Sequence, residues 1–359
     1  MCTTPAPHPR PTDKSLPEFP TGWYCVGFSD ELQSSTLLTR RLMNQELVLY
    51  RNEKQEIVVA QAHCPHLGAH FGHGGKIIDG ELECPFHAFR FNDQGQCTQT
   101  GYDTKPPRAA QLKIWPSREQ SGLILVWYHP EQQAPQWEVP TLDTANWSPW
   151  SHTSWVVKTH PQEIVENSVD FGHFKVIHGY DETEVISPAT LDGPHLHARY
   201  AMTRAADVFL GLQKTIRTQF DVAVHGLGVS VVHAHVRDYD LELRILVLPT
   251  PIGNNRVELR AALAIDERVV PEQVNPLLAL LPARLSKRLV RSMAFKGYAH
   301  DIAQDFPMWE NKIYIEKPTL AQGDGPIGLY RKWTQQFYAP ARGSSLVQLP
   351  SRGVLVPAA

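Results

Sequence analysis

Two short segments, Cys64-Pro65-His66 and Cys84-Pro85-Phe86-His87, decide the fold of the first half of the chain and are separated by 17 residues. Each segment offers one thiolate and one imidazole. Two such halves suit a [2Fe–2S] cluster in which one iron binds both thiolates and the other binds both imidazoles. Neutral imidazoles in place of two thiolates raise the reduction potential of such a cluster. This part of the sequence therefore predicts a one-electron carrier.

A structural zinc site is the alternative for the same side chains, because zinc also binds two cysteines and two histidines. Zinc fingers usually pair Cys with Cys and His with His along the chain, whereas here each half holds one of each. Small residues and prolines nearby, such as Gly72 and Pro85, let backbone N–H groups turn toward cluster sulfurs. The pattern favours the cluster, and we expect His63, His70 and His73 to be ordinary loop residues.

A second set of candidate ligands follows the pattern Asp170-x2-His173-x4-His178. The Asp and the first His share a face of a helix. The two histidines are splayed by about 140° on a regular helix, so they converge only if the helix ends or bulges between them; Gly179 favours an ending. Two histidines and one carboxylate form the facial triad of non-haem Fe(II) oxygenases. The alternative is a half-exposed helix that carries two histidines.

The third ligand of such a triad is expected far along the chain. Residues 301–310 offer Asp301, Asp305 and Glu310. We favour Asp305 and keep Asp301 as the alternative, since Asp301 could equally be a charge on a helix face or a cap. The periodicity of the segment does not decide between them.

Together these motifs resemble the terminal oxygenase (α) component of Rieske non-haem iron oxygenases, over about residues 20–340. The resemblance implies a [2Fe–2S] cluster on Cys64, His66, Cys84 and His87, and a mononuclear Fe(II) on His173, His178 and Asp305. It also implies a homotrimer, in which Asp170 links the neighbouring chain's His87 to His173 of its own chain. Asn167 is expected near the iron.

The C-terminal sequence resembles one branch of that family. Its segments are similar to the endings of 3-ketosteroid 9α-hydroxylase oxygenases and sterol 7-desaturases: Gln304-Asp305, Trp309–Lys312, Gly323–Pro326 and Arg331–Trp333. This implies a hydrophobic, steroid-like or polycyclic substrate and hydroxylation with O₂ (monooxygenation). Desaturation, demethylation and aromatic dihydroxylation are the alternatives. No Gly-rich nucleotide-binding turn is visible, so electrons from NAD(P)H are expected through a separate reductase, with or without a ferredoxin.

A non-enzymatic alternative is a Rieske electron-transfer protein fused to a lipid-binding module. The net charge of −3 gives no basic footprint for nucleic acid. No apolar run reaches the roughly 18 residues of a membrane span, and no secretory signal is visible. Five cysteines, two of them assigned to iron, indicate a reducing compartment. We expect a cytoplasmic protein, with peripheral membrane association as the alternative because sterols reside in lipid.

The expected class is α+β. Residues 1–20 are expected to be disordered, 21–135 to form an antiparallel β Rieske domain, 150–340 a helix-grip catalytic domain, and 341–359 a flexible tail. Strands are expected at 23–28, 46–50, 57–60, 122–128, 228–236, 241–248 and 256–264, and helices at 161–176 and 271–305. His233 and His235 share one side of a strand; we expect them to be partly exposed rather than to line a pocket.

Overall fold

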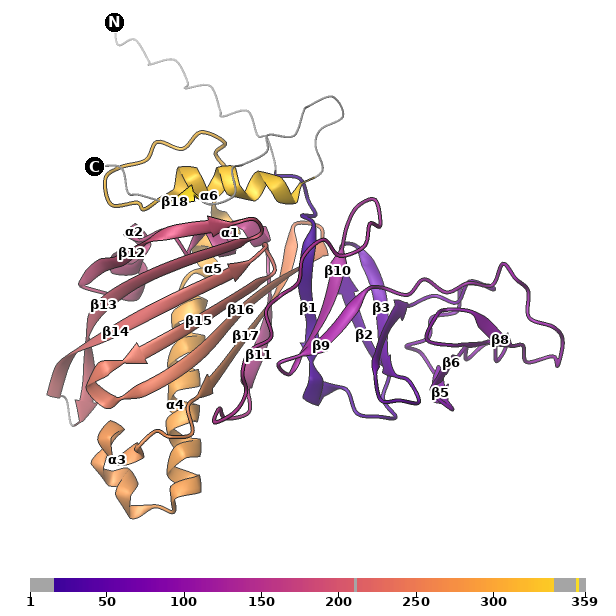
Figure 1. Cartoon of the computed structure of the whole chain (residues 1–359), viewed down its shortest axis with the longest axis horizontal. Helices are drawn as coiled ribbons and strands as arrows, with labels where there is room; N and C mark the ends of the chain where they lie inside the picture. The colour runs from indigo at the N-terminus through magenta and orange to yellow at the C-terminus, as the bar shows by residue number, and fades with distance from the viewer. Residues whose placement is uncertain (1–15, 210–211, 339–352, 355–359) are drawn as a thin grey trace, which may run out of the picture.

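The computed structural model describes residues 16–209, 212–338 and 353–354. The expectations for residues 1–15, and for the tail apart from 353–354, therefore lie outside the described residues. An N-terminal half made of small antiparallel sheets adjoins a C-terminal half in which a long helix crosses a large antiparallel sheet (Figure 1). The expected α+β class, with a β domain followed by a helix-grip domain, is confirmed.

The N-terminal half holds three sheets, with strand orders β1-β10-β9, β2-β3-β4 and β5-β6-β7-β8. The strands are β1 (Gly22–Phe28), β2 (Leu38–Leu42), β3 (Gln45–Arg51), β4 (Ile57–Gln61), β5 (Lys76–Ile78), β6 (Glu81–Glu83), β7 (Arg90–Phe91), β8 (Cys97–Gln99), β9 (Ser117–Gln120) and β10 (Leu123–Tyr128). The four strands expected here are confirmed as β1, β3, β4 and β10. Strand β1 is buried on both faces, because Tyr24 and Val26 pack against β3 and β4 while Trp23 and Cys25 pack on the large sheet.

The C-terminal half is built on an eight-stranded antiparallel sheet of order β11-β17-β16-β15-β14-β13-β12-β18. Its strands are β11 (Ser151–Val157), β12 (Glu182–Asp192), β13 (His195–Phe209), β14 (Leu212–His225), β15 (Val229–Val236), β16 (Leu241–Gly253), β17 (Arg256–Ile265) and β18 (Gly353–Val354). The three expected strands are confirmed as β15, β16 and β17. On β15, Val229 and Val231 pack against the N-terminal half, so the alternate side chains face the opposite side.

Six α-helices are present in the described part: α1 (Pro161–Glu166), α2 (Gly172–His178), α3 (Pro271–Val274), α4 (Ala283–Gln304), α5 (Phe306–Asn311) and α6 (Ile327–Thr334). The single helix expected over 161–176 is wrong, because the chain leaves helical structure after Glu166 and buries Val169 completely before α2 begins. The expected helical run 271–305 is interrupted at Pro276 and Pro282, since proline cannot continue a helix. Its long part, α4, is confirmed.

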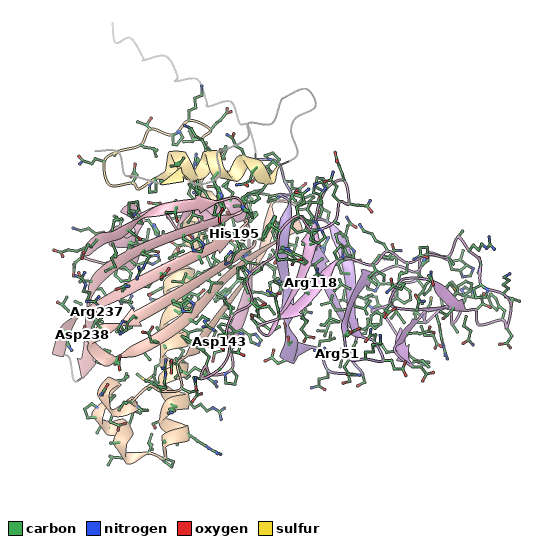
Figure 2. The ribbon with its side chains drawn as sticks, in the orientation of Figure 1. Arg51, Arg118, Asp143, His195, Arg237 and Asp238 are labelled. Carbon is green, nitrogen blue, oxygen red and sulfur yellow. The ribbon has the colours of Figure 1, made fainter. Side chains whose placement is uncertain are left out.

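Polar contacts fix the two halves to each other. The carbonyl oxygen of Cys25 accepts hydrogen bonds from Thr250 Oγ1 at 2.6 Å and from Arg260 Nη1 at 2.9 Å. The connecting segment 129–149 reaches the large sheet at Asp143 (Figure 2), and the Asp143 carbonyl oxygen accepts a hydrogen bond from the Arg244 guanidinium on β16. No helix in the described ranges is both long enough and apolar enough to cross a membrane.

Candidate metal centres

The two N-terminal motif loops have the same backbone hydrogen bonds. Cys64 N–H donates to the Ala69 carbonyl at 2.8 Å, and Gly68 N–H donates back to the Cys64 carbonyl at 2.9 Å. Cys84 repeats both bonds with Phe89 and Ala88, at 2.8 and 3.1 Å. Gly68 and Ala88 have left-handed φ values of 78° and 52°, which a small residue tolerates best. The sequence therefore folds the two half-motifs into matching loops.

The loops direct four candidate ligands inward. Cys64 and Cys84 are each 3% exposed, and burial raises the pKa of the Cys64 thiol to about 12. The imidazole rings of His66 and His87 lie 4.9 Å apart between centroids. Within the described residues, Nδ1 of each ring is buried without a hydrogen-bond partner. Two orphaned nitrogens beside two buried thiols form a donor set that suits iron.

This arrangement fits a cluster better than a single zinc ion. In the described part of the chain, two groups of three side chains each bring one ligand atom per residue within 4.8 Å of one another, and neither group contains these cysteines and histidines. A tetrahedral zinc ion would draw its four ligands to one point. A binuclear cluster spreads its ligands over two irons.

One of those two groups is the second candidate centre, formed by His173, His178 and Asp305. His178 Nε2 lies 3.4 Å from Asp305 Oδ2, and the two imidazole centroids are 5.2 Å apart. A helix break between the histidines was expected and is not present. Helix α2 instead ends directly after His178, where Gly179 adopts a left-handed φ of 69°. Asp305 lies between α4 and α5 and is 6% exposed.

Hydrogen bonds orient both histidines of this centre. His173 Nδ1 donates to the Asp170 carbonyl at 2.5 Å, and His178 Nδ1 donates to Gln304 Oε1 at 3.0 Å. In the neutral form of each ring the proton is then on Nδ1 and Nε2 is free to bind a metal; His173 Nε2 is buried without a partner among the described residues. Burial lowers the pKa of His178, but the hydrogen bonds to Asp305 and Gln304 outweigh this and raise it. The arrangement matches metal-binding histidines, which donate their second N–H to an acceptor.

The other two acidic candidates do not converge with the histidines and have partners of their own, although Asp301 lines the same cavity. Asp301 Oδ2 accepts a hydrogen bond from Arg204 Nη1 at 2.9 Å, so its charge is already paired. Glu310 is exposed, and its carboxylate accepts from the Lys158 backbone N–H at 3.3 Å. Of the three acidic residues that the sequence offered, the structure brings only Asp305 to the histidines. The orienting role of Gln304 was not predicted, although its place before Asp305 is a signal that could have been used.

The Asp170 carboxylate lies beside the same centre. Its Oδ2 atom is 3.7 Å from His173 Nδ1, and its side chain is 29% exposed. Asn167 lines a cavity that begins at this centre. Asp170 therefore faces both a candidate ligand and the molecular surface.

The cavity lies between the large sheet and α4 and has a volume of about 430 Å³. Its walls are mostly apolar side chains that alternate along the strands, such as Met202, Val222, Val232, Ala234, Leu243 and Ile245. Ser230 also lines it, is 2% exposed, and has no hydrogen-bond partner for Oγ in the described ranges. His233 and His235 point away from the cavity, toward Trp147 and toward Asp240 and Glu242. Their expected placement is confirmed.

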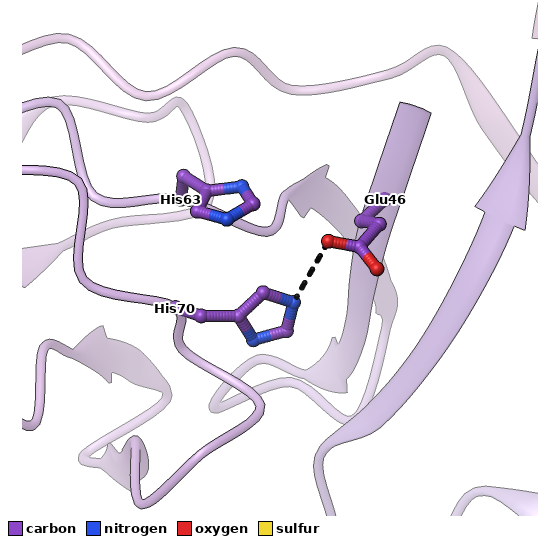
Figure 3. Close-up of side chains that lie close together, drawn as sticks. All are labelled: Glu46, His63 and His70. Atoms are coloured by element: carbon purple, nitrogen blue, oxygen red, sulfur yellow. Dashed lines mark ion pairs between the residues drawn. The ribbon is translucent and has the colours of Figure 1, made fainter. Parts of the chain in front are cut away.

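The second convergent group consists of Glu46, His63 and His70 (Figure 3). His70 Nε2 is 3.6 Å from Glu46 Oε2, and Nδ1 of the same ring accepts the Gly72 backbone N–H at 2.9 Å. A neutral ring whose Nδ1 accepts a hydrogen bond carries its proton on Nε2. That proton occupies the nitrogen that faces the Glu46 carboxylate at 3.6 Å, so this nitrogen is not free to bind a cation, and the hydrogen bond from Gly72 holds the ring in the loop.

Comparisons with known proteins match both halves of the chain. Residues 22–116 match the Rieske [2Fe-2S] domain, and residues 126–338 match the 3-ketosteroid 9alpha-hydroxylase C-terminal domain. Cholesterol 7-desaturase nvd from Xenopus laevis is 30% identical over 341 residues, which cover 90% of this chain and 72% of the relative. The oxygenase component of 3-ketosteroid-9-alpha-monooxygenase from Rhodococcus rhodochrous is 26% identical and covers 89% of this chain and 84% of its own.

Solved structures share the fold. NdmA from Pseudomonas putida CBB5 superposes with a TM-score of 0.67 at 17% identity, covering 87% of this chain and 88% of that one. Apo dicamba monooxygenase superposes with a TM-score of 0.63 at 17% identity, covering 88% and 96%. At this identity the likeness concerns the fold alone.

Proposed function

This chain belongs to the Rieske non-haem iron oxygenases, in the branch defined by the 3-ketosteroid 9α-hydroxylase C-terminal domain, and we propose that it hydroxylates a steroid-like or polycyclic substrate. It is an oxidoreductase of the Rieske type. One observation carries the proposal: the apolar cavity of about 430 Å³ begins at the convergent His173, His178 and Asp305. A pocket of this size and character suits a small hydrophobic ligand.

We assign the cluster to Cys64, His66, Cys84 and His87, and the mononuclear iron to His173, His178 and Asp305. When bound, these groups supply single electrons and the reductive activation of O₂. The orphaned Nδ1 atoms of the first site and the orphaned Nε2 of His173 support the assignment. NAD(P)H is proposed as the electron source, through a separate reductase with or without a ferredoxin.

The chain's own residues prepare the second site. The Asp170 carbonyl and the Gln304 amide hold both histidines with Nε2 free. Arg204 pairs with the Asp301 carboxylate, and this ion pair keeps Asp301 from competing with Asp305 for a cation. The apolar walls would exclude water and orient the substrate beside the three candidate ligands. Asn167 extends the polar end of the cavity.

We propose a homotrimer in which the Rieske end of one chain meets the iron end of the next. Figure 1 shows β5, β6 and β8 at one end of the molecule and α2 toward the other, so the two sites of one chain lie far apart. Large apolar side chains are exposed beside both: Leu67 (65%), Phe86 (62%) and Tyr102 (53%) near the cluster loops, and Val176 (82%) and Met308 (51%) on α2 and α5. A head-to-tail contact that closes into a ring would cover both patches.

In that assembly the Asp170 carboxylate would lie between two imidazoles: beside its own His173, whose Nδ1–H the Asp170 backbone carbonyl holds, and as the acceptor of a hydrogen bond from His87 of the next chain. Support comes from its position, since the carboxylate is partly exposed and only 3.7 Å from the His173 ring nitrogen. A carboxylate between two imidazoles orients both rings. Sedimentation of wild type and of Phe86→Asp tests the assembly: we expect trimers and monomers, respectively, and a monomeric wild type would rule it out.

Desaturation is the second candidate reaction, because the Xenopus laevis relative is named a cholesterol 7-desaturase. One experiment tests both reactions. The protein is loaded anaerobically with sterols, 3-ketosteroids or aromatic compounds, and a reductase and NADH are added. Air is then admitted, and the products are analysed by mass spectrometry. Hydroxylation adds one oxygen atom, whereas desaturation removes two hydrogen atoms. A fully iron-loaded protein that converts none of these compounds would contradict the proposal and favour the electron-transfer alternative.

A further inference from the structure

The turn before α4 and the first turns of α4 expose an unusual amount of apolar side chain. Leu280 is 81% exposed, Leu277 56% and Met293 55%. Leu285, Leu289 and Met293 are spaced by four residues, which places them in one row along the helix. We call this set the leucine surface: Leu277, Leu280, Leu281, Leu285, Leu289 and Met293, all at least 36% exposed.

Basic side chains lie on one side of the leucine surface, next to it around α4. Residues 270–300 contain five lysines and arginines and a single acidic residue, Glu272, although the whole chain has a net charge of −3. Four of the five cations line a second cavity of about 400 Å³: Arg284, Lys287, Arg288 and Arg291. Arg284 and Arg288 form no ion pair within the described ranges, and the only carboxylate in the cavity wall is that of Glu267, 3.9 Å from Lys287 Nζ. The cavity therefore offers unpaired positive charge.

The leucine surface meets the substrate cavity at Met293, which is exposed and also lines the cavity, and we call this point the cavity mouth. Val274, Val290, Met293 and Ala294 line that cavity, and Met293 also belongs to the exposed row on α4. Figure 1 shows α3 and the start of α4 extending beyond the large sheet, at the end opposite α6. An apolar molecule that enters beside Met293 would cross the leucine surface.

We propose that the leucine surface, with its adjacent cations, docks on a membrane that contains anionic phospholipids, so that the cavity mouth faces the lipid. The idea rests on the proposed function, because a hydrophobic substrate dissolved in a bilayer gives the contact its purpose. Helices that present an apolar row next to basic side chains bind the interface of anionic membranes in this way. A second copy of this chain is a poor occupant, since two surfaces rich in lysine and arginine would repel each other.

The test measures binding of the iron-loaded protein to vesicles by flotation, using phosphatidylcholine alone and phosphatidylcholine with phosphatidylserine. We expect at least tenfold tighter binding to the anionic vesicles, and weaker binding as the salt concentration rises. Replacing Arg284 and Arg288 together by Gln should weaken that binding about 30-fold. Leu280→Asp should also weaken it strongly. The matched control is Leu320→Asp, because Leu320 is 43% exposed and belongs to neither cavity mouth nor leucine surface.

Several outcomes would overturn the proposal. Equal binding of Leu280→Asp and Leu320→Asp would show that the leucine surface does not contact lipid. A change of oligomeric state in Leu280→Asp, without a change in vesicle binding, would assign the surface to a contact between copies. Displacement by millimolar inorganic phosphate at constant ionic strength would assign the basic cavity to a free anion. Vesicle binding without turnover of any substrate would leave the docking intact and remove the proposed function instead.

Discussion

Gln304 is expected to control iron affinity without being a ligand. Its Oε1 atom lies 3.0 Å from His178 Nδ1, and the His178 side chain is only 8% exposed. Gln304→Leu removes the acceptor and leaves a buried N–H that water reaches poorly. Removing such a partner typically lowers metal affinity 10- to 100-fold, which corresponds to about 1.4–2.7 kcal/mol. Because the ring is so well buried, we expect a value in the upper half of that range.

The assay is anaerobic titration of the protein, freed of mononuclear iron, with Fe(II) against a competing chelator. Gln304→Glu keeps an acceptor for Nδ1–H and should retain most of the affinity. Gln336→Leu is the control for loss of a glutamine elsewhere, since Gln336 donates to the Gly193 carbonyl at 3.1 Å. If Gln304→Leu binds Fe(II) as tightly as wild type, the orienting role assigned to Gln304 is wrong.

Other predictions follow from the same geometry. Asp305→Asn should lose the mononuclear iron and keep the cluster, whereas Asp301→Asn should keep both, as measured by iron content per chain. Asp170→Ala should retain both metal sites yet lose nearly all turnover; full activity would exclude the bridging role. Ser230→Ala should weaken binding of a sterol about fivefold in calorimetry but leave a hydrocarbon without oxygen unaffected, because one net hydrogen bond contributes about 1 kcal/mol. Burial lowers the pKa of His160 to about 4. Between pH 6.5 and 4 only the unfolded chain therefore binds this proton, and the free energy of unfolding should fall by up to about 3 kcal/mol as the pH is lowered across that interval. In His160→Asn the unfolding free energy, measured across that interval, should depend less steeply on pH than it does in the wild type.

The parts of the site that the sequence predicted are those held by local structure. Each cluster loop closes through hydrogen bonds between residues four and five positions apart. The sequence around Cys64 and Cys84 is therefore enough to predict the two loops. His173 and His178 lie on one short helix whose end is marked by Gly179. In such segments spacing along the chain largely fixes spacing in space.

The third carboxylate could not be chosen from the sequence because distant elements distinguish the candidates. Asp301 and Asp305 are four residues apart and would share a face of a helix. The structure separates them through Arg204 on β13, which pairs with Asp301, and through the end of α4, which turns Asp305 toward α2. The break between α1 and α2 is of the same kind. It depends on the burial of Val169 in a core cluster that includes Tyr330, which is far away along the chain.

The alternation of side chains on β15 couples the domain contact to the substrate cavity. Val229 and Val231 pack against the N-terminal half, whereas Ser230 and Val232 line the cavity. A shift of one residue in register would exchange these two sets. The pairing of Ser230 with Val247 and of Val231 with Leu246 therefore fixes the cavity wall and the seat of the N-terminal half together. A sheet packed on both faces holds the two candidate metal centres of one chain at a fixed separation, and this rigidity supports the proposed transfer of electrons between neighbouring chains.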